Sequence, residues 1–296
     1  ISLGVAGDDP RRIEAGVLFE LSFNLTGGHT FLPRAKLAAA TAQLLSVPVE
    51  AVEEGISRLH EGERLVCQTL ADIDVVYLPH IHEAEVYCAY RLLKFAQWPH
   101  PEPENTERLL KQVEEESAVR YSDQQRHAIR SAAGSGVLII TGGPGTGKTT
   151  ALQTMIALLQ TYGLNTLLAA PTGRAAKRMS ELCGKEAKTL HRLLESVFDA
   201  AQGTVAFRRD RQNPLDTDVI IVDEASMLDL MLASSLLDAM KSHARLILIG
   251  DADQLPPMGP GSFFSELLAC PNIAKTRLTE IFRQAQGSDI VINSHM

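Results

Sequence analysis

The strongest structural signal in the 296-residue sequence is Thr141-Gly142-Gly143-Pro144-Gly145-Thr146-Gly147-Lys148-Thr149-Thr150. It fits the pattern G-x-x-x-x-G-K-[ST], in which glycines let backbone N–H groups surround phosphate oxygens at the start of a helix. The apolar run Val137–Ile140 precedes it and predicts a strand, and a helical pattern follows it. This context favours a phosphate-binding loop over an ordinary glycine-rich turn.

The residue types in this loop predict a site for ATP and Mg²⁺. Lys148 is expected to reach the β- and γ-phosphates, which makes it a candidate catalytic residue as well as a nucleotide ligand. The Thr149 hydroxyl is expected to ligate Mg²⁺ and to lie beside the phosphates. The other candidate nucleotide-binding residues of the loop are Gly142, Gly143, Gly145, Thr146, Gly147 and Thr150.

Three more short apolar runs follow the loop and alternate with helical patterns. They cover residues 164–170, 219–222 and 246–249. Near-continuous Val, Ile and Leu in such runs indicates parallel strands buried on both faces. The sequence therefore predicts an α/β fold with a parallel sheet covered by helices on both sides.

Polar side chains follow two of these strands, where ligands bind in open α/β sheets. Asp223 and Glu224 come directly after the run 219–222. Asp223 is suited to ligate Mg²⁺, and Glu224 is suited to deprotonate or orient an attacking water. Gln254 follows the run 246–249 and is a candidate to sense the γ-phosphate by hydrogen bonding. The alternative for Asp223 and Glu224 is a strand that merely ends in solvated acids, and the alternative for Gln254 is an ordinary turn. The phosphate-binding loop upstream argues against both.

Composition excludes several classes of protein. The chain is 45% hydrophobic and 22% charged, which supports folded domains rather than disorder. No apolar run reaches the ~18 residues of a membrane span, and Cys67, Cys88, Cys183 and Cys270 lie too far apart for a zinc ribbon. Free thiols of this kind favour a cytoplasmic location.

Charge is distributed unevenly. Residues 1–120 hold 19 acidic against 11 basic side chains, whereas the remainder holds 17 of each and accounts for none of the net charge of −8. Residues 172–211 are locally basic, with 9 basic and 5 acidic side chains. Because a local basic stripe is enough to hold a polyanion, the second part is the candidate nucleic-acid binder.

The first eighty residues predict three helices and a hairpin. Helices are expected from Asp9-Pro10 onward, over 33–45 and over 49–60, followed by strands at 64–70 and 73–78. This is the outline of a winged helix-turn-helix. Its acidic balance favours a packing or protein-binding module over a DNA-contacting one, so a protein partner is expected here.

Three motifs together resemble superfamily-one DNA helicases of the RecD type, in their long form with an N-terminal extension. These are Asp223–Ser226, Gly250–Pro257 with the sequence Gly-Asp-Ala-Asp-Gln-Leu-Pro-Pro, and Leu278–Gln284 with the sequence Leu-Thr-Glu-Ile-Phe-Arg-Gln. The resemblance is specific from Tyr121 onward. It implies a RecA-like sheet domain, single-stranded DNA as partner, 5′-to-3′ movement, and repair or recombination as the setting.

The resemblance also implies roles for single residues. Gln125 matches a glutamine that reads the adenine edge, although family members usually begin that motif with Leu where this chain has Tyr121. Arg283 matches a catalytic arginine that stabilises transition-state charge, which suits a bidentate guanidinium. The implied single-strand contacts are Thr172, Gly173, Arg174, Lys177, Thr189, His191 and Arg192.

The resemblance implies a division of the chain. The expected parts are a winged-helix-like domain (1–96), a linker and connecting helix (97–120), a RecA-like ATPase domain (121–278) with a strand-separating pin hairpin at about 197–214, and the start of a second lobe (279–296). The front half of a helicase, poorly active alone, is therefore expected. Alternatives are a P-loop ATPase that remodels RNA or protein, and a nucleotide-gated adaptor; no separate acidic cluster suggests a nuclease.

Overall fold

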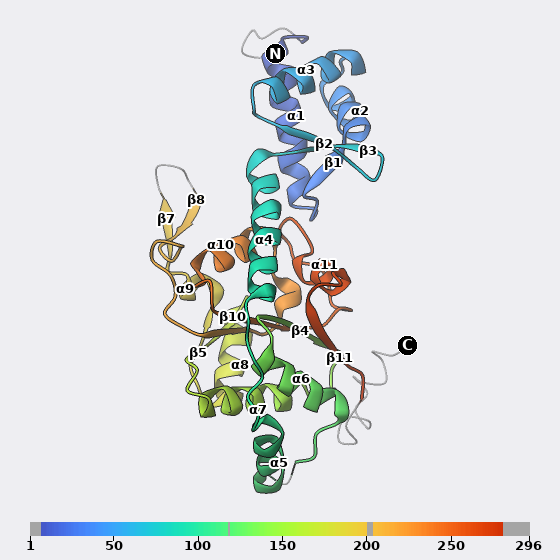
Figure 1. Ribbon diagram of the computed structural model, residues 1–296. Helices are drawn as coiled ribbons and strands as arrows, with labels where there is room; N and C mark the ends of the chain where they lie inside the picture. Colours follow the sequence, from blue (N-terminus) through green and yellow to red (C-terminus); the bar gives the residue numbers. More distant parts are fainter. Residues whose placement is uncertain (1–6, 118, 200–203, 281–296) are drawn as a thin grey trace. The chain divides into compact units, whose positions relative to one another are not determined.

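The computed structural model describes residues 7–117, 119–199 and 204–280, and its chain forms two compact units (Figure 1). The first unit comprises residues 1–88 with the short segments 229–231 and 257–261, and the second comprises the rest. The division between Cys88 and Ala89 falls inside helix α4 (Pro79–Gln97). The domain limits expected from the sequence stay predictions.

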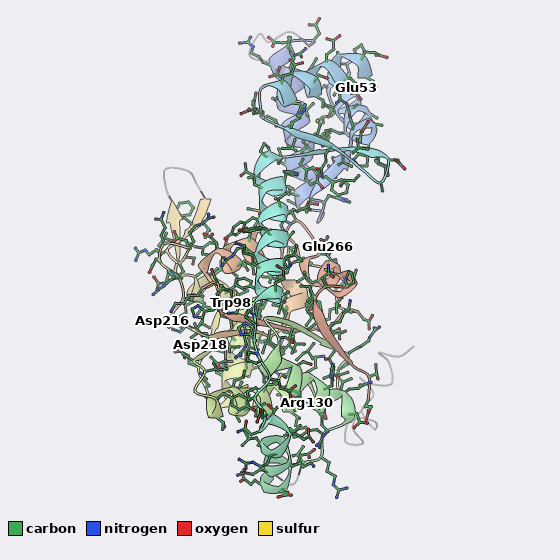
Figure 2. All side chains as sticks on the ribbon, in the orientation of Figure 1. Glu53, Trp98, Arg130, Asp216, Asp218 and Glu266 are labelled. Carbon is green, nitrogen blue, oxygen red and sulfur yellow. The ribbon has the colours of Figure 1, made fainter. Side chains whose placement is uncertain are left out.

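The first unit has the element order of a winged helix. Its three-stranded antiparallel sheet has the order β1-β3-β2, and the two-residue turn Ala71-Asp72 has positive φ at both positions, as in a tight hairpin. Glu53, labelled in Figure 2, pairs with Arg34 at 2.6 Å and so fastens α3 to α2. The elements are α1 (Pro10–Leu25), β1 (Phe31–Pro33), α2 (Arg34–Leu45), α3 (Val49–Glu61), β2 (Val66–Leu70) and β3 (Ile73–Tyr77). Strand β1 was not expected, because three residues ending in proline carry no alternating pattern.

The second unit is built on a six-stranded parallel sheet in the order β11-β4-β10-β9-β5-β6. Every residue of β4, β9 and β10 is buried, which explains their near-continuous apolar sequences. The predicted α/β fold with a parallel sheet is confirmed. The strands are β4 (Val137–Gly142), β5 (Thr166–Ala170), β6 (Ala187–Thr189), β9 (Val219–Val222), β10 (Arg245–Gly250) and β11 (Ala274–Leu278).

Helices cover both faces of this sheet. Helices α6, α7 and α8 lie on one side, and α10 and α11 lie on the other (Figure 1). A separate two-stranded hairpin is formed by β7 and β8. These elements are α5 (Thr106–Ser117), α6 (Asp123–Gly134), α7 (Lys148–Thr161), α8 (Gly173–Cys183), α9 (Leu190–Leu193), β7 (Ser196–Asp199), β8 (Thr204–Phe207), a 3₁₀ turn (Ala225–Met227), α10 (Leu230–Ala239) and α11 (Phe263–Ala269).

Two arginines fasten the connecting segments to the second unit. Arg91, in the second half of α4, donates to the carbonyls of Leu237 and Met240, and its charge suits the C-terminal end of α10. Arg126 on α6 pairs with Glu107 at 2.7 Å and Glu114 at 2.5 Å, both on α5. These contacts hold the second half of α4 and the whole of α5 against the sheet domain.

His100 lies in the linker between α4 and α5, and we expect it to make stability depend on pH. Burial, with Arg245 and His243 nearby, lowers the pKa of this imidazole to about 4, and its Nε2 atom is buried without a hydrogen-bond partner among the described residues. Between pH 6.5 and about 4 the unfolded chain therefore binds this proton more readily than the folded one. We expect His100 to contribute a loss of stability as pH falls through this window.

The measurement is the urea midpoint at pH 7.5 and at pH 5 for the wild type and His100→Gln. The wild type should lose more stability between the two pH values than the variant does, because only the wild type carries this titrating imidazole. An equal loss in both would show that His100 does not cause the dependence.

Candidate nucleotide-binding site

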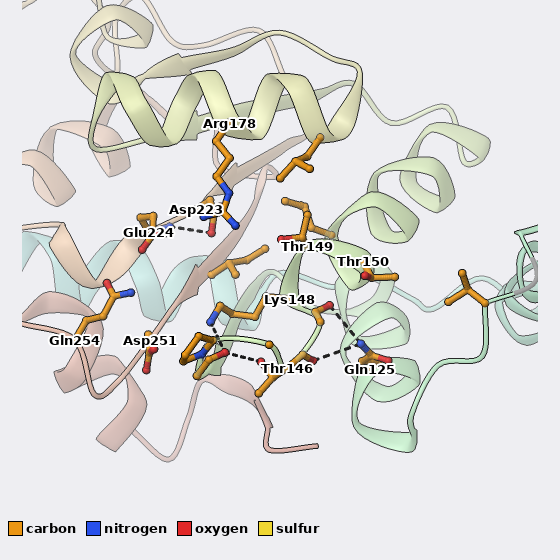
Figure 3. A pocket seen from close by; sticks show the side chains of 18 of the residues that line it. Gln125, Thr146, Lys148, Thr149, Thr150, Arg178, Asp223, Glu224, Asp251 and Gln254 are labelled. Atoms are coloured by element: carbon orange, nitrogen blue, oxygen red, sulfur yellow. Dashed lines mark hydrogen bonds between the residues drawn. The ribbon is translucent and has the colours of Figure 1, made fainter. Parts of the chain in front are cut away.

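Apart from Gly142, the candidate ATP-site residues in the described part of the chain line one open cavity of about 970 Å³ at the carboxyl edge of the sheet (Figure 3). The phosphate-binding loop follows β4, the two adjacent carboxylates follow β9, and Gln254 follows β10. Because these three strands are parallel neighbours, their carboxyl ends meet at the same edge. The topology thus brings together motifs more than a hundred residues apart.

The loop has the backbone geometry of an anion cradle. Gly145 and Gly147 have φ values of 79° and 76°, a left-handed conformation that glycine adopts without steric cost. The Thr146 hydroxyl donates to the Gly143 carbonyl at 2.9 Å and closes the loop. Lys148 begins α7, and its Nζ atom donates to the carbonyls of Gly142 and Gly143.

Lys148 lies among acidic groups in a partly buried place. Burial lowers the pKa of its ammonium, while the carboxylates of Asp251, Asp223 and Glu224 act in the opposite direction. Asp251 is itself buried at the end of β10 and accepts the backbone N–H of Asp253 at 3.1 Å. One lysine against three carboxylates leaves room for further positive charge at this end of the cavity.

Asp223 and Glu224 have different surroundings although they are adjacent. Asp223 accepts the backbone N–H of Glu224 at 2.9 Å, and burial together with the neighbouring Glu224 charge raises the pKa of the Asp223 carboxyl. Glu224 has φ 53° and ψ 37°, an uncommon conformation for a residue with a side chain. This turn directs the chain away from the strand and brings both carboxylates to the cavity wall.

The donor set fits Mg²⁺. The Thr149 hydroxyl and the Asp223 carboxylate are hard oxygen ligands on the same cavity, and a divalent ion would favour ionisation of Asp223 against the effect of burial. No cluster of three or more acidic, histidine or cysteine side chains suited to a metal is found among the described residues. Mg²⁺ typically takes few protein ligands and completes its shell with phosphates and water.

Gln254 is tied to the segment that carries the two carboxylates. Its Oε1 atom accepts a hydrogen bond from the Ser226 hydroxyl at 3.0 Å. Ser226 lies in the 3₁₀ turn directly after Glu224. The sequence did not single out Ser226, although its place in Asp-Glu-Ala-Ser offered a signal.

Gln125 lies at the opposite end of the cavity and is only 1% exposed. It forms a capping box with Ser122 at the start of α6, its Oε1 accepting from the Ser122 N–H at 3.0 Å. Its Nε2 donates to the Gly147 carbonyl at 3.3 Å. The residue expected to read adenine therefore holds the phosphate loop in this structure, and its adenine contact stays a prediction.

Tyr121, at the position where the family usually has leucine, makes a buried hydrogen bond that leucine cannot make. Its ring is buried in the core between α6 and α7, and its hydroxyl shares a 2.5 Å hydrogen bond with Thr154 on α7. Thr154 in turn donates to the Thr150 carbonyl in the first turn of α7. The tyrosine thus supports the helix that carries Lys148.

Tyr121→Phe should lower the free energy of unfolding by about 1 kcal/mol, because it deletes one buried hydrogen bond and keeps the ring. Thr154 retains its bond to Thr150, so no orphaned hydroxyl remains. Urea unfolding measures the effect, with Tyr90→Phe at a half-exposed position as control. Equal stability of Tyr121→Phe and wild type would mean that the hydroxyl contributes nothing.

The predicted DNA contacts gather at the carboxyl ends of β5 and β6. Thr172 and Thr189 are the N-caps of α8 and α9, each hydroxyl accepting a backbone N–H at 3.2 Å. These two strands are parallel neighbours. Gly173, Arg174, Lys177, His191 and Arg192 are exposed beside them. Lys177 forms a solvated pair with Glu181 at 3.9 Å, and DNA contact by the whole set stays a prediction.

Strands β7 and β8 overlap the stretch at about 197–214 where the pin is expected. Phe198 and Val205 face each other across it and are 71% and 56% exposed. At its base the ring of Phe207 packs against His191, with ring centroids 5.8 Å apart. Exposed apolar side chains on a supported hairpin are compatible with a pin, which stays a prediction. Arg283 lies outside the described residues.

Two arginines that line the cavity were not foreseen from the sequence. Arg178 lies on α8 and extends toward Asp223 (Figure 3), and Arg120 lies just before α6. Arg178 is four residues after Arg174, so helical spacing could have flagged it, but the sequence does not say which side of α8 faces the cavity.

The parallel sheet and its loop define a P-loop nucleotide-binding domain, and a family model described as an AAA domain matches residues 125–260. The chain is 34% identical to the ATP-dependent RecD2 DNA helicase of Deinococcus radiodurans over 99% of its own length and 41% of that protein. It is 41% identical to the RecBCD enzyme subunit RecD of Mycobacterium tuberculosis, over 49% of this chain and 28% of that one. The Haemophilus influenzae RecD subunit is 37% identical over 49% and 26%.

The chain is similar to RecD-type helicases of superfamily one. It spans well under half the length of the curated relatives that it matches. No helix in the described part of the chain combines the length and apolarity that crossing a bilayer requires.

Proposed function

We propose that this chain is the ATP-binding front part of an ATP-dependent DNA helicase that moves 5′ to 3′ on single-stranded DNA in repair or recombination, in the cytoplasm. The observation that carries the proposal is the cavity in which the phosphate loop, the two carboxylates after β9 and Gln254 converge. The similarity to a protein named as an ATP-dependent DNA helicase, over nearly the whole chain, supports DNA as the substrate.

The cavity residues predicted from the sequence have distinct roles in the proposed reaction. Lys148 leaves its carbonyl partners to bind the β- and γ-phosphates, and the loop N–H groups hold the remaining oxygens. Thr149 and Asp223 hold Mg²⁺, which neutralises phosphate charge when bound. Glu224 orients a water toward the γ-phosphate and accepts its proton. Gln254, held by Ser226, senses whether the γ-phosphate is present.

The proposed DNA path runs along the β5–β6 end of the sheet. The hydroxyls, backbone and cationic tips of the predicted contact set would hold phosphates without reading sequence. The nearby β7–β8 hairpin would separate strands. The winged-helix unit, with its acidic balance, would bind a protein partner.

We expect slow turnover from this polypeptide by itself. Hydrolysis of the γ-phosphate requires neutralisation of transition-state charge, and in the proposed motor a second lobe supplies part of it. The curated relatives are more than twice as long as this chain. A turnover rate typical of complete motor ATPases would contradict this expectation.

The test of the proposed function is binding of a fluorescent single-stranded DNA by anisotropy, with and without a non-hydrolysable ATP analogue and Mg²⁺. We expect the nucleotide to change the DNA affinity, and Arg174→Ala with Arg192→Ala to weaken DNA binding several-fold. Arg108→Ala, an exposed arginine on α5, is the matched control. Preference for RNA, or no nucleic-acid binding alongside nucleotide-dependent capture of a protein, would overturn the helicase proposal in favour of an RNA or protein remodeller or an adaptor.

A further inference from the structure

Arg178 is a cation in the nucleotide cavity for which neither the sequence motifs nor the proposed reaction provides a role. It lies midway along α8 and lines the cavity together with Leu182, one turn further on. Figure 3 shows its side chain extending from α8 toward Asp223. It makes no hydrogen bond or ion pair with the part of the chain that the structure describes.

The position of Arg178 along the cavity indicates which part of a nucleotide it would meet. Its charge acts on Asp223 and on Lys148, and Gln125 lies across the cavity from these groups (Figure 3). In a P-loop site the lysine and the Mg²⁺ carboxylate lie at the β- and γ-phosphates. Arg178 therefore lies at the terminal-phosphate end, on the wall formed by α8.

The charge balance of this end favours a second cation. Asp223, Glu224 and Asp251 face one ammonium, that of Lys148, and a triphosphate adds further negative charge. A guanidinium is always charged, and its planar donors suit the paired oxygens of a phosphate. An arginine without a protein partner can donate to that phosphate without first breaking an ion pair.

We propose that Arg178 binds the γ-phosphate of the nucleotide and lets the site distinguish a nucleoside triphosphate from a diphosphate. This inference rests on the proposed function, since it needs ATP in the cavity. It adds a consequence: α8 begins at Gly173, among the predicted DNA contacts, and bears Arg178 one and a half turns later. When the γ-phosphate is lost, Arg178 no longer connects the nucleotide to α8, the helix at the start of the proposed DNA path.

The test is equilibrium binding of fluorescent ADP and of a fluorescent non-hydrolysable ATP analogue, both with Mg²⁺, to the 296-residue chain. Arg178→Ala should weaken binding of the triphosphate about tenfold or more and that of ADP less than about twofold. Arg178→Lys, which keeps the charge and loses the planar fork, should fall between wild type and Arg178→Ala. Arg108→Ala, remote from the cavity, should bind both nucleotides as wild type does.

Three results would overturn the assignment: unchanged triphosphate affinity in Arg178→Ala, equal weakening of ADP and triphosphate, or wild-type behaviour in both Arg178 variants. If Arg178→Ala melts at a lower temperature than wild type, the comparison rests on Arg178→Lys, for which several-fold loss of triphosphate preference is expected. Failure of the wild type to bind either nucleotide would instead overturn the proposed function, so the two failures are distinguishable.

Discussion

Lys148→Ala should lower ATP hydrolysis by about 100-fold or more and weaken binding of the triphosphate. The variant removes the ammonium expected to contact the β- and γ-phosphates and leaves three carboxylates in the cavity without its positive charge. It also frees the Gly142 and Gly143 carbonyls, which the ammonium contacts in this structure.

The measurement is single-turnover phosphate release, together with titration of a fluorescent ATP analogue. Lys111→Ala, an exposed lysine on α5, is the matched control and should behave as wild type. A melting temperature equal to that of wild type would exclude unfolding as the cause. Hydrolysis retained at the wild-type rate in Lys148→Ala would place the reaction elsewhere.

Glu224→Gln should reduce hydrolysis by about 10² to 10⁴-fold while triphosphate binding persists. Glutamine preserves the size of the side chain, and the backbone N–H of residue 224 still bonds to Asp223. The variant loses the basicity needed to accept a proton from water, together with one negative charge of the cavity. The separation of binding from turnover distinguishes this variant from Lys148→Ala.

Phosphate release and nucleotide titration on the same preparation give both quantities. Glu181→Gln, an exposed acid on α8, is the control. Turnover unchanged in Glu224→Gln would show that another group activates the water. Loss of both binding and turnover would assign Glu224 to nucleotide binding.

The sequence predicted the parts of the fold whose patterns are local and strong. The four buried strands of the sheet centre have uninterrupted apolar runs, and the glycines before Lys148 have a spacing with one common structural meaning. Strand β6, of three residues, and edge strand β11, whose side chains are partly exposed, have no such runs and were missed. Their formation depends on pairing with β5 and β4, which is a tertiary effect.

The sequence predicted the motifs of the site but not the contacts between its segments. Lys148, Asp223 and Gln254 were named from the residues that surround them, and the cavity brings them together. Arg178 and the Ser226 bond to Gln254 depend on how α8 and the 3₁₀ turn are rotated against the sheet. Helical spacing fixes which residues share a face, but the neighbour of that face is set by packing.

The most direct test of the proposed ATP site is ATP hydrolysis by the chain with and without single-stranded DNA, in wild type and Lys148→Ala. We expect slow hydrolysis by the wild type that single-stranded DNA increases, and background rates in Lys148→Ala under both conditions. Hydrolysis that responds to RNA but not to DNA, or that persists in Lys148→Ala, would contradict the claim that this cavity is the ATP site of a DNA motor.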